Sequence, residues 1–234
     1  MENYRYIKEN YLSLKDEIAE LSARLGMPEP TLVAVTKSGT DEELLALAAA
    51  GAADIGENRP GELKRRADIL RASGFYPNMH EIGTLQRNKI KLIIEDAHLV
   101  HSLDTPRLAK DLARHAEALG RRIPVLIEIN SAKEAQKGGI LPSEAEEFLA
   151  SLSEYGALIP SGLMTMGPAV SDPEELRPYF RETRRLFERL LGKFEAKEPI
   201  LSMGMSDSYK LAIEEGSTLV RVGRKLFRKN ESEE

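Results

Sequence analysis

The sequence predicts an α/β protein built as a single (β/α)8 barrel, a TIM barrel, with an extra N-terminal helix. Short apolar runs bounded by turn residues alternate along the chain with longer segments of helical period, which is the pattern of repeated βαβ units. Eight such runs occur, and 234 residues is close to the length of one such barrel. An open doubly wound sheet is the alternative, but strand number and chain length favour the barrel.

The predicted strands are apolar on both faces. Runs such as LVAV and VLIEI place apolar residues at consecutive positions, as a parallel sheet wrapped by helices requires. A sheet with one face in water would alternate instead. The eight strands are predicted at residues 31–37, 53–56, 78–83, 98–102, 123–130, 157–165, 199–202 and 217–223.

Helical patterns lie between these strands, with Asp, Thr or Pro at their starts and Gly at several of their ends. A further helix precedes the first strand, and we expect it to pack on its own barrel. A coiled-coil partner ranks second, because three heptads are short and tyrosine is unusual in a coiled-coil seam. Its apolar residues alternate spacings of three and four: Tyr4, Ile7, Tyr11, Leu14, Ile18, Leu21 and Leu25.

Composition limits the partners and the location. The formal net charge is −5 and the basic residues are spread along the chain, which disfavours a nucleic-acid partner. Cysteine is absent, so disulfides and thiolate chemistry are excluded. Residues 1–26 lack the apolar core of a signal peptide or membrane span. We expect a cytoplasmic monomer without a membrane partner, with one domain over residues 1–229 and a disordered tail at 230–234.

Lys37 is the first candidate for chemistry. It ends the predicted first strand on the same face as Val33 and Val35, at the rim where barrels of this kind carry their active sites. Desolvation at an apolar rim favours the neutral amine, which attacks carbonyl carbon. Lys37 is therefore placed to form an imine, although a rim lysine that reaches out to water is an equally good interpretation of this strand alone.

The loops after the seventh and eighth strands are the second candidate, because these loops commonly bind phosphate in this fold. Ser206 precedes a helical run, so its hydroxyl can cap the helix or face an anion. Gly223 lets the backbone approach a ligand with no Cβ in the way. Arg221 sits inside an apolar run and needs a partner, which is either a structural salt bridge or a ligand at the barrel mouth.

Two other segments follow strands at the same rim. Asn58, in GENRPGEL, can cap a helix or reach a ligand oxygen. Met164 and Met166, in GLMTMG, share one face and are more typical of barrel core than of a ligand contact. His98 and His101 are three apart on a predicted strand, so we expect them to point to opposite faces and not to form a metal pair.

Seven segments in order resemble the pyridoxal phosphate homeostasis protein family. They are VAVTK, GENRPGEL, HEIGTLQRNK, residues 130–139, GLMTMG, LSMGMSD and VRVG, and they span residues 31–227. The resemblance implies that Lys37 carries pyridoxal 5′-phosphate (PLP) as a Schiff base. It also implies that Arg221 meets the pyridine nitrogen, and that Asn58 lies beside the ring, with Met164 in the same site. The phosphate would be bound by Ser206, Gly223 and the backbone of Arg224.

Three positions depart from the family pattern. Glu81 stands where an aromatic or apolar residue is usual, and Thr84 where His is usual, so any role assigned to that segment is in doubt. Arg224 replaces a small hydroxyl residue, but it keeps its backbone N–H and adds positive charge, so we expect phosphate binding to survive.

The resemblance implies a PLP-binding protein in vitamin B6 homeostasis that lacks efficient catalysis and supplies client PLP-dependent enzymes. An arginine at the pyridine nitrogen leaves it unprotonated and weakens the electron sink of the ring. The barrel end also resembles the N-terminal domain of alanine racemase, whose second domain supplies another acid/base group; we see no candidate for that domain here. The alternative is a slow PLP-dependent racemase or decarboxylase, and a third hypothesis is a phosphate-binding barrel enzyme without PLP.

Overall fold

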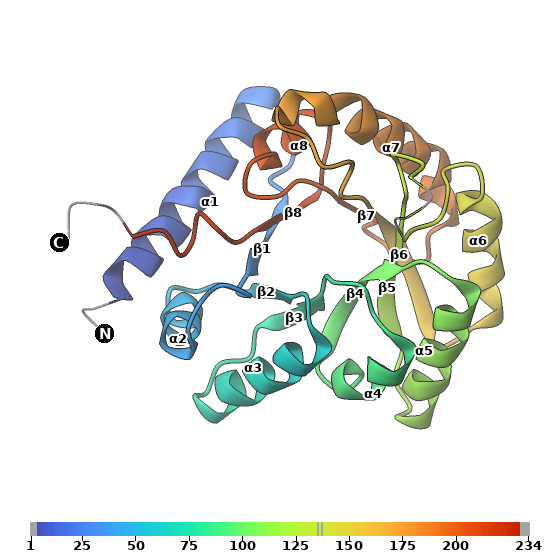
Figure 1. Ribbon diagram of the computed structural model, residues 1–234, viewed down its shortest axis with the longest axis horizontal. Helices are drawn as coiled ribbons and strands as arrows, with labels where there is room; N and C mark the ends of the chain where they lie inside the picture. The colour runs from blue at the N-terminus through green and yellow to red at the C-terminus, as the bar shows by residue number, and fades with distance from the viewer. Residues whose placement is uncertain (1–3, 135, 137, 230–234) are drawn as a thin grey trace.

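The computed structural model describes residues 4–134, 136 and 138–229, in which eight parallel strands close into a barrel (Figure 1). Each strand pairs with the next in sequence and β8 pairs with β1, which confirms the barrel over the open sheet. The predicted tail at 230–234 lies outside the described residues. The strands are β1 (Thr31–Val35), β2 (Asp54–Glu57), β3 (Asn78–Glu81), β4 (Ala97–Leu103), β5 (Ile123–Glu128), β6 (Leu158–Met164), β7 (Ile200–Ser202) and β8 (Leu219–Val222).

Helices surround the barrel in the order that the βαβ pattern predicts (Figure 1). None of the helices in the described part of the chain is long and apolar enough to cross a bilayer. The α-helices are α1 (Arg5–Leu25), α2 (Asp41–Ala49), α3 (Pro60–Ala72), α4 (Ile90–Ile93), α5 (Pro106–Ala118), α6 (Ala145–Ser151), α7 (Arg177–Leu190) and α8 (Tyr209–Glu214). Short 3-10 turns are η2 (Arg87–Lys89), η3 (Leu152–Glu154), η4 (Pro173–Leu176) and η5 (Leu191–Lys193).

The N-terminal helix completes the ring of helices. It packs against α2 and α8, and its apolar stripe forms one buried cluster with Val220 and Val222 of β8 (Figure 1). It thereby occupies the place that a helix after β8 would take, and the predicted packing of this helix on its own barrel is confirmed. It also holds the segment after β8, since Asn10 donates to the carbonyls of Leu226 at 3.1 Å and Arg228 at 2.8 Å.

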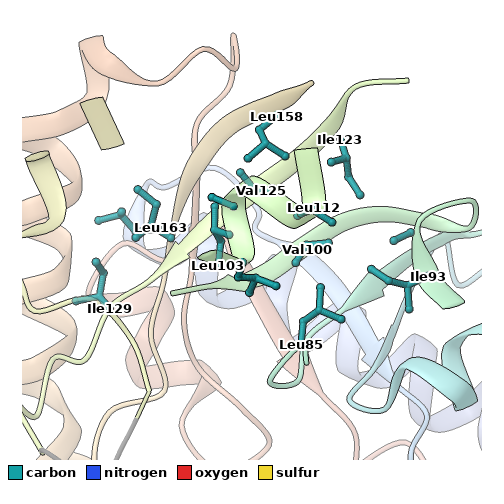
Figure 2. Close-up of a cluster of buried hydrophobic side chains, with 14 of the residues drawn as sticks. Leu85, Ile93, Val100, Leu103, Leu112, Ile123, Val125, Ile129, Leu158 and Leu163 are labelled. Atoms are coloured by element: carbon teal, nitrogen blue, oxygen red, sulfur yellow. The ribbon is translucent and has the colours of Figure 1, made fainter. Parts of the chain in front are cut away.

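Two hydrophobic layers stabilise the barrel. The larger lies between the strands and the outer helices, where Val100 and Val125 of the sheet meet Leu112 of α5 (Figure 2). The smaller contains residues from strands alone, so it fills the barrel interior; its buried members are Val33, Leu99, Leu126, Met164 and Leu219. Burying apolar area on both faces of every strand is the main source of stability in such a fold.

A pair of carboxyl groups is buried where β2 and β3 end. Glu57 and Glu81 are register partners on neighbouring strands, and both are fully buried. Glu57 accepts a hydrogen bond from Thr36 and lies 3.0 Å from Arg66 Nε. Glu81 accepts only from the Gly83 N–H, at 3.1 Å, and its Oε2 has no hydrogen-bond partner among the described residues. Burial raises the pKa of Glu81 to about 8, and the nearby Glu57 adds to the shift.

Glu81→Gln is expected to remove a pH-dependent cost of folding. Because the folded-state pKa of Glu81 is raised to about 8, its favourable contribution is complete below about pH 4.5 and is lost as the pH rises through 8. Glutamine keeps the acceptor for Gly83 and cannot ionise. Urea unfolding should therefore show the variant more stable than the parent by roughly 2–4 kcal/mol at about pH 8.5, and nearly equal to it at about pH 5.

The matched control is Glu117→Gln, at an exposed glutamate of α5. It should leave the pH dependence of the unfolding free energy as it is in the parent. A Glu81→Gln variant whose stability follows the parent at every pH would contradict an ionisation cost at this site.

Candidate functional site

The closing pair of strands brings the two ends of the barrel sequence to one rim. Gly223 lies so close to β1 that a Cβ there would stand 2.9 Å from the Val35 carbonyl oxygen. A Cβ on Gly39 would likewise collide with the Phe227 ring. The requirement for glycine at position 223 thus comes from strand packing. The turn that carries Lys37 and the segment after β8 therefore lie together.

Lys37 stands in a turn just beyond β1, because the strand ends at Val35 and not at residue 37 as predicted. Its side chain is exposed, so the expected desolvation by the barrel rim is not found. The turn itself is held on both sides. The Thr36 N–H donates to the Gly56 carbonyl at 3.1 Å, and Gly39 closes the turn by donating to the Thr36 carbonyl at 2.9 Å.

Ser206 brings three of the predicted site residues together. Its hydroxyl oxygen accepts from the backbone N–H of Gly223 and of Arg224, each at 3.2 Å. Of the two interpretations of Ser206, the helix cap does not hold, because Ser208 occupies that position and α8 begins at Tyr209. Both N–H groups are directed at the Ser206 oxygen, whose own hydrogen can donate in turn, so an anion at this place would compete with Ser206 for the two N–H groups.

The Arg224 side chain points away from this donor set. Its guanidinium pairs with Asp207, and 68% of the side chain is exposed. The contribution of Arg224 to the cluster is therefore its backbone N–H, the one group that any residue at this position supplies.

Arg221 is buried inside the barrel and has one polar partner on β7 and another just after β6. One terminal nitrogen donates to Ser202 Oγ, and the other donates to the Thr165 carbonyl at 3.2 Å. Burial lowers the pKa of Arg221 to about 10, and the Glu128 carboxylate opposes that shift. The group stays cationic at neutral pH. The partners that the sequence required for Arg221 are thus the Ser202 hydroxyl on β7 and the Thr165 carbonyl after β6, with the Glu128 carboxyl group nearby.

Glu128 is a second ionisable group in the barrel interior. It is 8% exposed at the end of β5, and burial followed by the charge of Asp104 raises its pKa to about 7. A carboxyl that titrates near neutrality beside a buried arginine is typical of functional sites. Sequence reasoning missed it, although an acidic residue inside the apolar run VLIEI is the counterpart of Arg221 inside TLVRVG.

The other two predicted site residues have different surroundings. Asn58 is half-buried just after β2 and does not cap α3, whose first flanking residue is Arg59. Its backbone lies against Gly83, where a Cβ would collide. Met164 is 1% exposed within the interior core, as the more conservative interpretation held, whereas Met166 is exposed.

The histidines of β4 do not point to opposite faces, so that prediction is wrong. The register of β3 with β4 shifts between Met79 and His80, which indicates an irregularity at His98. As a result both rings lie against His80, with ring centroids 5.8 Å from His98 and 5.3 Å from His101. Within the described residues, no group of three or more potential ligands could hold a metal ion.

Comparison with known proteins now assigns the family. The model for the alanine racemase N-terminal domain matches residues 10–230. A pyridoxal phosphate homeostasis protein of Aquifex aeolicus is 40% identical over 176 residues, which are 74% of this chain and 75% of that protein. The chain belongs to the pyridoxal phosphate homeostasis protein family. The resemblance drawn from seven sequence segments is therefore confirmed.

Solved structures of relatives share the barrel. PipY of Synechococcus elongatus, solved with PLP bound, is 30% identical with a TM-score of 0.82, and the match covers 95% of this chain and all of that one. Alanine racemase of Corynebacterium glutamicum shares the fold with a TM-score of 0.74 at 19% identity, over 97% of this chain and 62% of the racemase. The family and the alanine racemase N-terminal domain thus share one barrel.

Proposed function

We propose that this chain binds PLP reversibly as a Schiff base on Lys37 and serves vitamin B6 homeostasis in the cytoplasm, without efficient catalysis. One observation carries the proposal: the N–H groups of Gly223 and Arg224 both meet Ser206 Oγ. They do so at the same rim of the barrel as the turn that holds Lys37 after β1. The relatives named for PLP homeostasis, and PipY with PLP bound, support it.

The residues present fit the cofactor. Bound PLP supplies an aldehyde that condenses reversibly with an amine, and a ring that withdraws electrons. The Ser206 hydroxyl would donate to its phosphate, together with the N–H groups of Gly223 and Arg224 once they exchange the Ser206 oxygen for a phosphate oxygen. Arg221 would donate to the ring nitrogen with its remaining N–H groups. Because the guanidinium stays charged, that nitrogen remains unprotonated, which keeps carbanion chemistry weak. Asn58 and Met164 would lie beside the ring.

A slow racemase or decarboxylase is the second candidate, and Glu128 is the observation that favours it. A carboxyl with a pKa near 7 inside the barrel can move a proton at neutral pH, which a second acid/base group requires. We expect this activity to be negligible beside binding and exchange of PLP. Client PLP-dependent enzymes are the proposed recipients, and the chain is proposed to act as a monomer.

Lys37→Ala is expected to abolish the imine absorbance band of PLP-loaded protein, because it removes the amine proposed to form the imine. In the parent, borohydride reduction followed by peptide mass spectrometry should find one pyridoxyl group, on Lys37. Lys89→Ala, at an exposed lysine of η2, is the control and should retain the band. A pyridoxyl group on another lysine would overturn the assignment. A band that is present in the parent and lost in Lys37→Ala would exclude the hypothesis of a phosphate-binding barrel without PLP.

Ser206→Ala is expected to weaken PLP binding by roughly tenfold or more, because a charge-assisted hydrogen bond to phosphate is lost. Arg224→Ala and Arg224→Thr should both bind within about twofold of the parent, since the backbone N–H remains and the side chain pairs with Asp207. Absorbance titrations with PLP, and with pyridoxal as the ligand that lacks phosphate, measure this. A large loss for Ala and none for Thr would show that the Arg224 side chain is dispensable only when a hydroxyl replaces it.

The enzyme alternative has its own test. Loaded protein in deuterated buffer should leave the α-proton of added amino acids unexchanged, as read by proton NMR over hours. Exchange that disappears in Glu128→Gln would establish the racemase-like reaction and remove the proposal of a non-catalytic carrier.

A further inference from the structure

A chain of buried polar side chains crosses the barrel interior below Arg221. Asp54 opens β2 at the N-terminal rim, and its Oδ1 lies 3.0 Å from His80 Nε2. His80 Nδ1 is 3.0 Å from His101 Nε2, and His101 Nδ1 is 3.0 Å from Ser202 Oγ. Ser202 in turn accepts from Arg221. The chain of contacts therefore runs from the half-buried Asp54 to the candidate cofactor site.

The direction of these hydrogen bonds follows from what each group can do. Arginine only donates, so Ser202 accepts from Arg221 and can pass its own hydrogen to His101 Nδ1. His101 then carries its proton on Nε2 and donates to His80 Nδ1. His80 carries its proton on Nε2 and donates to the Asp54 carboxylate. Every member is satisfied with both imidazoles neutral.

The opposite direction does not satisfy the same set. A doubly protonated His80 would donate to both Asp54 and His101, and His101 would then donate to Ser202. Ser202 would then accept from both Arg221 and His101, and its hydroxyl hydrogen would have no acceptor among these five residues. That state would also bury an additional charge, since only 3% of the His80 side chain is exposed.

We propose that Ser202, His101, His80 and Asp54 form a one-way hydrogen-bond relay that positions Arg221 for the cofactor. Ser202 holds one terminal nitrogen of the guanidinium, and the Thr165 carbonyl holds the other at 3.2 Å. The remaining N–H groups are left for a ligand at the mouth. These four are positioning residues, because they act on the cofactor through Arg221.

The Asp54 carboxylate at the far end of the relay strengthens Ser202 as an acceptor for Arg221. Hydrogen bonds in a chain polarise one another, so an anion at one end strengthens the acceptor presented to the cation at the other. Asn78 donates a hydrogen bond to Asp54 Oδ1 at 3.0 Å. Burial alone would raise the pKa of Asp54, but the hydrogen bonds from His80 and Asn78 outweigh burial, so the pKa is lowered. Asp54 can therefore stay ionised at the neutral pH at which the relay is needed.

The first test uses protein without PLP. The chain has four histidines, so isotope-labelled imidazole nitrogens can be assigned by substitution and their protonation read by NMR. His80 and His101 should both appear at neutral pH as neutral rings with the proton on Nε2. His115, which donates to the Asp111 backbone carbonyl on α5 and lies outside the relay, serves as the internal reference. A charged His80, or a proton on Nδ1 of either relay histidine, would overturn the relay.

The second test rests on the proposed function. Ser202→Ala should raise the dissociation constant for PLP roughly tenfold and mix the two neutral forms of His101 in the cofactor-free protein. Asp54→Asn, at the opposite rim, should raise it roughly threefold and alter the His80 signals. Ser217→Ala is the matched control: this buried serine donates only to carbonyls of β7 and β8 and their flanks, so affinity and histidine signals should stay as in the parent.

The two proposals can fail separately. Parent protein that binds no PLP while keeping both Nε2 protons would remove the proposed function and leave the hydrogen-bond chain in place as a structural feature. Folded Ser202→Ala and Asp54→Asn variants that bind PLP like the parent would remove the positioning role. Since Asp54 lies at a rim, its variant remains informative if Ser202→Ala does not fold.

Discussion

The pairing of β8 with β1 is the constraint on which the site depends. Four successive residues of β1, Thr31 to Ala34, are in register with Leu219 to Val222 of β8. The pairing puts segments nearly 190 positions apart in sequence on one rim, and the missing Cβ of Gly223 lets the strands approach. Without closure, the turn of Lys37 and the donors around Ser206 would have no fixed relation. The N-terminal helix secures this closure from outside, because its cluster contains residues of both strands.

A buried cation in the barrel interior sets the second constraint. Removing a guanidinium from water is costly, and an ion pair in the interior often returns less than that cost. Here Arg221 is held by a hydroxyl and a carbonyl, and the charge of the nearby Glu128 carboxylate favours its cationic form. This arrangement leaves some arginine donors available for a ligand, which a bidentate salt bridge would consume.

The sequence predicted the framework well, because strand number and order follow from local patterns of apolar residues. All eight strands and the N-terminal helix lie at the predicted places, although several strands are shorter than predicted, such as β1 and β8. The site was harder. The hydroxyl of Ser206 accepts from the N–H groups of residues 223 and 224 and does not cap the helix that follows it. An irregularity in β4 turns His98 toward His80. Both results depend on contacts between distant segments or on register, and residue spacing carries no information about either.

The exposure of Lys37 has a consequence for how tightly a ligand can be held. A lysine already desolvated by the protein loses no hydration when it bonds to a ligand, whereas the exposed Lys37 side chain must be desolvated at that moment. Hydration therefore stabilises the state without ligand and limits affinity. Contacts elsewhere on the ligand must supply the compensation, at its anionic end through the hydroxyl of Ser206 and the N–H groups of Gly223 and Arg224, and at its ring through Arg221. Under the proposed function this division has a use, because the phosphate contacts would retain PLP while the solvated amine would permit its exchange.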